Sequence, residues 1–237
     1  MSAPFSLKLA LGAGLLLAPS LAHAAFFSFG DDWSISANPQ NGYSYGKAAN
    51  TTDPLTLFNQ GHVGQPDLEA WQTSGVDLPV VLKNTSASDI FTGTPFIRPA
   101  SSRFLNLHPS SSGEYAVISY ALPQTGTLAF TADFASHDTT GATTDVHVFL
   151  DGTELFSGNI TGAGSTLAYA TPGGGLAVTA GGNLEVRVGF GTGGYAFDST
   201  GVKVEGSITA VPEPAETATC VAAALVAGGL WLRRQQR

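Results

Sequence analysis

Residues 127–134 read Thr-Leu-Ala-Phe-Thr-Ala-Asp-Phe, and every second position is apolar, at Leu128, Phe130, Ala132 and Phe134. A period of two places these four side chains on one face of a β-strand. The same alternation recurs in residues 114–122, 145–150, 184–190 and 202–208. Short alternating strands separated by glycine-rich turns predict an all-β fold, an antiparallel β-sandwich of the jelly-roll type.

The chain before residue 110 has a weaker pattern. Short apolar runs predict further strands at residues 31–38, 56–58 and 78–83, and the Ser/Pro-rich stretch 84–109 predicts a loop. No helical stripe of useful length occurs between residues 25 and 211, so no helix longer than about two turns is expected.

The composition excludes two broad classes of protein. The 237 residues include 18 acidic and 10 basic side chains, which gives a formal net charge of −8. Nucleic-acid binding requires clustered Lys and Arg for the phosphates, so no nucleic-acid partner is expected. The single cysteine, Cys220, has no partner within the chain, so no intrachain disulfide framework is expected either.

The N-terminus has the form of a secretory signal peptide. Lys8 precedes an apolar run of about ten residues, which is shorter than the roughly 20 needed to span a bilayer. Ala22-His23-Ala24 then supplies the small-x-small pattern that signal peptidase accepts. We therefore expect a signal peptide at residues 1–24, cleaved after Ala24, and a β-sandwich domain at residues 25–210.

The C-terminus, residues 211–237, contains three parts in order. The motif Val211-Pro212-Glu213-Pro214 precedes an apolar segment at residues 218–232, and the chain ends in a basic cluster with Arg233, Arg234 and Arg237. The apolar segment has a marginal length for a transmembrane helix, and the arginines after it would stay in the cytoplasm and hold the domain outside. A permanent anchor and a temporary anchor for a processing enzyme both fit this pattern.

This tail resembles a PEP-CTERM sorting signal, which marks substrates of exosortases in Gram-negative bacteria. The resemblance implies export, transient retention in the inner membrane and cleavage near Pro212-Glu213-Pro214 by an exosortase-type enzyme. Release or attachment at the cell surface would follow. The resemblance also implies a link to exopolysaccharide and biofilm, which are the usual setting of such proteins.

The domain itself resembles an uncharacterised jelly-roll module of exported bacterial proteins. The resemblance is carried by Asn38-Pro39, by residues 42–46 (Gly-Tyr-Ser-Tyr-Gly), by Trp71 and by residues 105–109 (Leu-Asn-Leu-His-Pro). The chain departs from that module at Ser110, where glycine usually follows His-Pro, and at Asn183, where aspartate often stands. The resemblance implies a fold like that of carbohydrate-binding modules and brings no established site.

No motif for catalysis occurs in the sequence. Gly-x-Ser-x-Gly, His-Glu-x-x-His and a Walker loop are all absent. Asp31 and Asp32 form a carboxylate pair, but adjacent residues of a strand point to opposite faces. A retaining glycosidase needs two carboxyl groups about 5 Å apart across its substrate. We therefore expect no catalytic residues and no enzyme.

Four aromatic residues in the first third of the chain are candidates for stacking on sugar rings: Trp33, Tyr43, Tyr45 and Trp71. Flat aromatic rings stack on weakly polar planes, and irregular segments often carry function. The alternative is that these large rings fill the core.

Residues 133–145 concentrate oxygen ligands of the kind that calcium prefers, and the candidate ligands are Asp133, Asp138 and Asp145. We expect this segment to be a loop flanked by strands, which Asp198 could join in the folded chain. The spacing is not that of an EF-hand, so a solvated loop without metal is the alternative. No other cofactor is expected.

Together these features predict an exported, non-catalytic protein of the cell surface or extracellular matrix, with a structural or adhesive role in a polymer layer. A carbohydrate-binding module of the same fold is the alternative, and a secreted hydrolase is a third hypothesis. A solvent-exposed row of two or three coplanar aromatic rings would favour sugar binding, whereas a pocket that joins histidine and aspartate would favour hydrolysis. The structural role would remain if neither feature were present.

Overall fold

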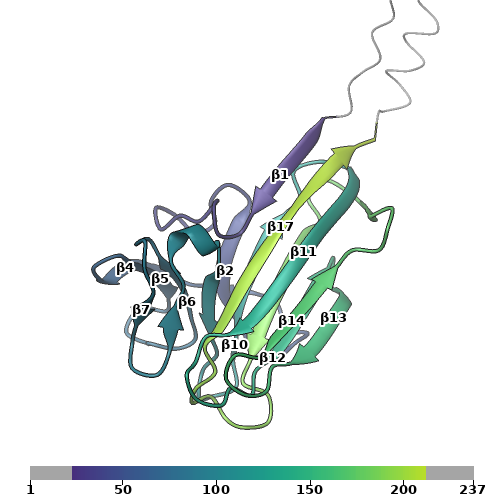
Figure 1. Ribbon diagram of the computed structural model, residues 1–237. Helices are drawn as coiled ribbons and strands as arrows, with labels where there is room; N and C mark the ends of the chain where they lie inside the picture. Colours follow the sequence, from purple (N-terminus) through teal and green to yellow (C-terminus); the bar gives the residue numbers. More distant parts are fainter. Residues whose placement is uncertain (1–22, 212–237) are drawn as a thin grey trace, which may run out of the picture. The chain divides into compact units, whose positions relative to one another are not determined.

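The computed structural model of the protein describes residues 23–211 (Figure 1). Within them, residues 23–210 form one compact unit. Several residues of the predicted signals lie outside the described range: Ala22, Pro212, Glu213, Pro214, Arg233, Arg234 and Arg237. Among the residues that are described, no helix is long and apolar enough to cross a membrane.

Eight strands form two facing antiparallel sheets. One sheet has the order β9 (Leu105–His108), β17 (Thr200–Ala210), β11 (Gly126–Ser136) and β14 (Thr166–Ala170). The other has the order β10 (Tyr115–Ala121), β16 (Asn183–Gly189), β12 (Asp145–Leu150) and β13 (Thr153–Asn159). Along the chain, these strands change sheet at every connection except the β12–β13 hairpin. That order is a jelly roll, so the predicted all-β, antiparallel sandwich is confirmed.

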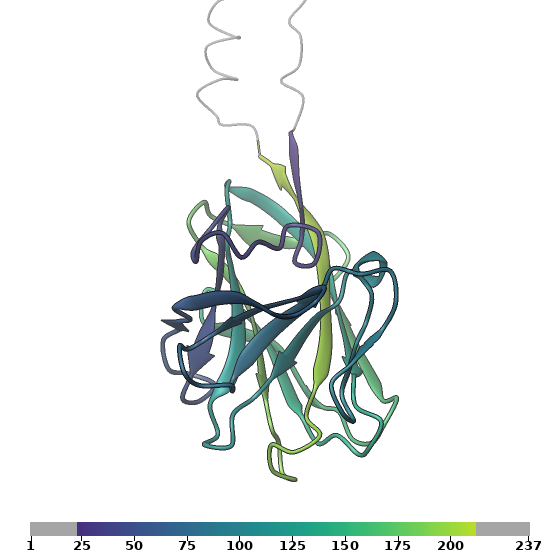
Figure 2. The same ribbon diagram turned by 90° about the vertical axis from the view of Figure 1, so that its left-hand side faces the viewer.

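The first hundred residues widen both sheets. β2 (Tyr43–Ala48) pairs with β10, and β3 (Thr56–Leu57) lies outside it. β6 (Val80–Asn84), β5 (Leu68–Gln72) and β4 (Gln60–Gln65) extend the other sheet from β9. These early strands appear in blue in Figure 2.

Four further short elements belong to the described fold. β15 (Leu176–Val178) pairs with one end of β11. β7 (Ile90–Phe91) and β8 (Phe96–Ile97) form a two-stranded hairpin. The 3-10 helix η1 (Ala100–Ser102) follows this hairpin and precedes β9.

Two expectations for this early part are wrong. Residues 31–38 form turns and bends instead of a strand, because Asp32 closes a turn with Ser28: Asp32 N donates to Ser28 O and Ser28 N donates to Asp32 Oδ2. Residues 84–109 are not one loop, because Ile97, Leu105 and Leu107 are buried and lie in strands.

The core fills the space between the sheets. Leu128, Phe130, Ala132 and Phe134 of β11 are all buried, as the alternation predicts. The strands β10, β12 and β16 supply the facing apolar side chains: Ile118, Val146, Val148, Leu184, Val186 and Val188. Burial of such a side chain contributes about 1.5–3 kcal/mol, which makes this layer the main stabilising feature of the sandwich.

Both ends of the described domain lie at the same end of the sandwich. β1 (Ala24–Ser28) runs antiparallel to the last part of β17, with Ala24 opposite Thr209. Ala210 N also donates to His23 O at 3.1 Å. Both ribbon views show β1 beside the end of β17 (Figures 1 and 2).

Candidate functional site

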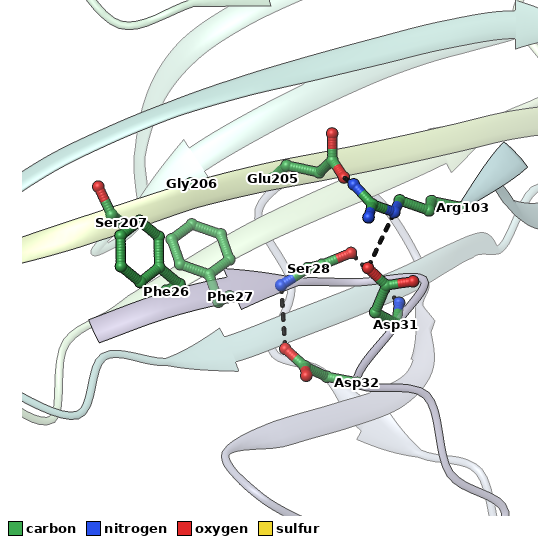
Figure 3. Close-up of a pocket in the computed structure, with 9 residues that line it drawn as sticks. All are labelled: Phe26, Phe27, Ser28, Asp31, Asp32, Arg103, Glu205, Gly206 and Ser207. Carbon is green, nitrogen blue, oxygen red and sulfur yellow. Dashed lines mark hydrogen bonds and ion pairs between the residues drawn. The ribbon is translucent and has the colours of Figure 1, made fainter. Parts of the chain in front are cut away.

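A cleft with a volume of about 560 Å³ opens beside the pairing of β1 with β17. Its walls are β1, the turn at residues 28–32, Arg103 after η1, and β17 around Glu205 and Ser207 (Figure 3). Three carboxylates and one guanidinium therefore share the cleft with the aromatic ring of Phe26.

Strand alternation explains why Phe26 projects into solvent. Phe27 points to the core, where its ring centroid lies 4.9 Å from that of Tyr120 in a stacked arrangement. Phe26 consequently points outward and is 81% exposed. On β17, Phe26 lies opposite Ser207, and Ser207 in turn lies opposite Ala129 of β11. Both side chains are small and leave the Phe26 ring uncovered.

Arg103 forms the polar side of the cleft. Its Nε lies 3.0 Å from Asp31 Oδ2, and its Nη1 lies 2.7 Å from Glu205 Oε1 (Figure 3). The hydrogen bond to Glu205 and the charge of Asp31 raise the pKa of Arg103, so this guanidinium is always charged.

The 28–32 turn lies directly against the backbone of Arg103. Arg103 has a left-handed conformation with φ of 61°. A Cβ atom at position 30 would overlap the Arg103 carbonyl group, so only glycine permits this approach. On the other side of the turn, the buried Lys83 donates from Nζ to Gly30 O at 2.8 Å. The turn is therefore fixed from both sides.

Asp32 connects the cleft to the core. Its Oδ2 accepts hydrogen bonds from Ser28 N at 2.9 Å and from the Tyr43 hydroxyl at 2.7 Å. Burial, followed by the hydrogen bond to Asp32, raises the pKa of Tyr43, so the phenol remains a neutral donor. The carboxylate is thereby held in one orientation.

This arrangement offers a ligand both an aromatic face and hydrogen-bonding groups. An exposed aromatic face can stack on the apolar face of a pyranose, while carboxylates accept from, and the guanidinium donates to, the sugar hydroxyls. Ser28 and Ser207 also line the cleft, and no histidine is among its lining residues.

The four aromatic residues predicted to stack on sugars belong to the core. Tyr43, Tyr45 and Trp71 are buried, and the half-buried Trp33 packs against them. The Tyr45 ring centroid lies 4.7 Å from that of Trp33 and 6.2 Å from that of Trp71. The sugar-stacking hypothesis is therefore wrong for these residues, because neighbouring protein groups cover their rings.

The three predicted calcium ligands do not form one site. Asp133 lies on the outward face of β11, where it pairs with Lys203 at 3.0 Å, whereas Asp138 is buried in the following loop. Asp145 begins β12 and accepts a hydrogen bond from Tyr115 at 2.6 Å. Across residues 23–211, no three or more His, Cys, Asp or Glu side chains are placed to hold a metal ion. The three-aspartate site is therefore wrong.

Histidine and carboxylates do meet on the outer face of the second sheet. His147 Nδ1 lies 2.7 Å from Glu154 Oε1, and its Nε2 lies 3.1 Å from Asp145 Oδ2. Burial lowers the pKa of His147, but the hydrogen bonds to Asp145 and Glu154 outweigh it, so the pKa is raised. Both ring nitrogens of His147 are therefore engaged by carboxylates of the same sheet.

No protein-family model matches the chain, and no curated protein matches it. One similar solved structure is CBM51 from Clostridium perfringens GH95 in complex with methyl-galactose, with 13% identity and a TM-score of 0.36 over 63% of this chain and 94% of that one. Another is the Stig cyclase Fisc from Fischerella sp. TAU, with 15% identity and a TM-score of 0.34 over 71% of this chain and 100% of that one. Scores this low define neither a family nor a ligand.

Proposed function

We propose that this protein is an exported, non-catalytic surface protein whose β-sandwich binds carbohydrate in the Phe26 cleft. The observation that carries the proposal is the placement of Phe26, an aromatic ring that is 81% exposed beside an open cleft lined by hydrogen-bonding groups. Bound to a polymer in this way, the domain would serve as a structural or adhesive component of an extracellular layer.

The charge of the cleft favours a neutral sugar. Asp31, Asp32 and Glu205 line the cleft with one guanidinium, that of Arg103, and Lys203 lies 3.8 Å from Glu205; the whole chain has a net charge of −8. Like charges repel, so a polymer rich in uronate, sulfate or phosphate groups would be disfavoured. We therefore favour a neutral hexose polymer, such as the exopolysaccharide of the producing cell.

Export and sorting form the second part of the proposal. Signal peptidase would cut after Ala24, which is the first residue of β1, so this cut would precede folding of that strand. The apolar segment at residues 218–232 would then hold the chain transiently at the inner membrane until an exosortase-type enzyme cleaves the chain at the sorting motif, residues 211–214. Ala24 lies opposite Thr209, so both cuts would release the domain at one end, which is compatible with a single tether.

Absence of catalysis is the third part. The sequence has no hydrolase motif, and the His147 cluster has no free ring nitrogen. A secreted hydrolase would need a base beside a nucleophile or two opposed carboxylic acids across a substrate. The three carboxylates of the cleft already have protein partners: Asp31 and Glu205 pair with Arg103, and Asp32 accepts from Ser28 and Tyr43.

A glycan array tests the binding function. The purified full-length protein, kept in a mild detergent, would be applied to neutral, amino and acidic glycans. We expect retention on neutral glycans and weak retention on acidic ones. Failure to bind any glycan, including exopolysaccharide isolated from the native host, would contradict the proposal.

A further inference from the structure

Two aspartates, Asp138 and Asp198, are buried at the end of the sandwich opposite the chain termini. Asp138 is 1% exposed and Asp198 is 0% exposed. In each carboxylate, Oδ2 is buried and has no hydrogen-bond partner within the described residues. A buried ionised carboxylate without a partner costs several kcal/mol, so two such oxygens indicate something that they bind.

The strand register brings the two carboxylates together. The ladder between β11 and β17 ends with Ser136 opposite Thr200, and His137 N then donates to Ser199 O at 2.8 Å. One further step of this register places residue 138 opposite residue 198. Facing side chains in such a position are direct neighbours.

Both side chains enter the space between the sheets. Asp138 continues the inward alternation of Phe134 in β11, and Asp198 continues that of Val202 in β17; all four are buried. The two carboxyl groups therefore share one buried position at this end of the sandwich.

The loop between β11 and β12 holds each carboxylate by its other oxygen. Asp138 Oδ1 accepts from Thr140 N at 3.1 Å and from Thr140 Oγ1 at 2.9 Å. Asp198 Oδ1 accepts from Thr143 N at 2.9 Å. These bonds fix the orientation of both groups and leave the two Oδ2 atoms available inside the protein.

We propose that Asp138 and Asp198 together bind a divalent cation of the calcium class through their Oδ2 atoms. Calcium takes oxygen ligands only and accepts carbonyl, hydroxyl and water oxygens beside carboxylates. The buried hydroxyls of Thr144 and Thr200, 2.9 Å apart, offer further oxygens near this position. Zinc is disfavoured because a zinc site needs at least three His, Cys, Asp or Glu ligands. Within residues 23–211, no group of three such side chains is placed to hold a metal ion.

Thermal unfolding at pH 7.5 tests this site, with the full-length protein in a mild detergent and either EDTA or calcium chloride. At a calcium concentration about a hundredfold above Kd, the wild-type Tm should rise by about 5–10 °C. Asp198→Asn and Asp138→Asn should abolish that rise. Asp133→Asn is the matched control, because it changes an outward aspartate of the neighbouring strand, and it should keep the full rise.

A calorimetric titration with calcium provides a readout that does not require the variants to fold. The wild type should bind one calcium ion per chain. Absence of binding, or a full calcium response in Asp198→Asn, would overturn the proposal. A proton is the alternative to calcium at this site. If calcium leaves the wild-type Tm unchanged while acidification raises it, the site holds a proton and the proposal is wrong.

Discussion

Arg103 Nη1 lies 2.7 Å from Glu205 Oε1, and this contact joins the segment after η1 to β17, a strand between β9 and β11. The arginine side chain is 52% exposed, so the pair is expected to add little to stability. Its consequence is positional: the guanidinium is held beside the same cleft that Phe26 borders.

Replacement of Arg103 should therefore separate binding from stability. We expect Arg103→Ala to weaken glycan binding, because the sugar loses a charged donor, while the Tm stays close to that of the wild type. Arg98→Ala is the matched control, since Arg98 is also exposed and pairs with Asp89 at 3.5 Å outside the cleft. Equal binding by the two variants would show that Arg103 has no role in recognition.

Tyr43→Phe should destabilise the domain. The change removes the hydroxyl that donates to Asp32 at 2.7 Å, and hydrogen bonds to charged groups contribute about 1.5–3 kcal/mol. Urea denaturation should show a loss of that order. Tyr195→Phe, at an exposed position, should show none. A loss no larger than that of the control would mean that Asp32 does not depend on Tyr43.

His147 should make stability depend on pH. A pKa raised in the folded state gives stabilisation that is complete below the unfolded pKa of about 6.5 and is lost as pH rises through the folded pKa. The Tm difference between wild type and His147→Gln should thus be larger at about pH 6 than at about pH 9. Burial lowers the pKa of His137 to about 3, so the contribution of His137 to stability has the opposite pH dependence. Because His137 is present in both proteins, it does not affect the Tm difference between them. A difference that does not change with pH would contradict this role.

Processing at both ends is tested by mass spectrometry of protein recovered from the native host. We expect a chain that starts at Ala25 and ends between Val211 and Pro214. Recovery of only intact C-termini at Arg237, in a host that has an exosortase, would refute cleavage and leave a permanent anchor.

β11 and β12 could be predicted because mainly one face of each strand is buried. Residues 145–150 coincide with β12, and residues 127–134 fall within β11. β14 was not predicted because it is largely exposed and its sequence has no strong apolar face. β9 was not predicted because its four residues lie in a Ser/Pro-rich region, although Leu105 and Leu107 are buried on one face of the strand.

The site was harder to predict because it depends on contacts between distant segments. Phe26 and Arg103 approach one cleft only after β1 pairs with β17 and Gly30 meets the backbone of Arg103. One signal was present: adjacent aromatics in a strand point to opposite faces, so Phe26 and Phe27 could not both be buried between the sheets. By the same rule, Tyr43 and Tyr45 share one face of β2, which is the face that the core covers.

The most direct test of carbohydrate binding is a calorimetric titration of the best glycan from the array into wild type, Phe26→Ala and Phe91→Ala. Phe91 is 62% exposed and lies in β7, outside the cleft, so it controls for the loss of any surface aromatic. Removal of a stacked ring costs about 1–1.5 kcal/mol, so Phe26→Ala should bind roughly tenfold more weakly. Phe91→Ala should match the wild type. An unchanged Kd for Phe26→Ala would contradict the assignment of this cleft as the sugar site.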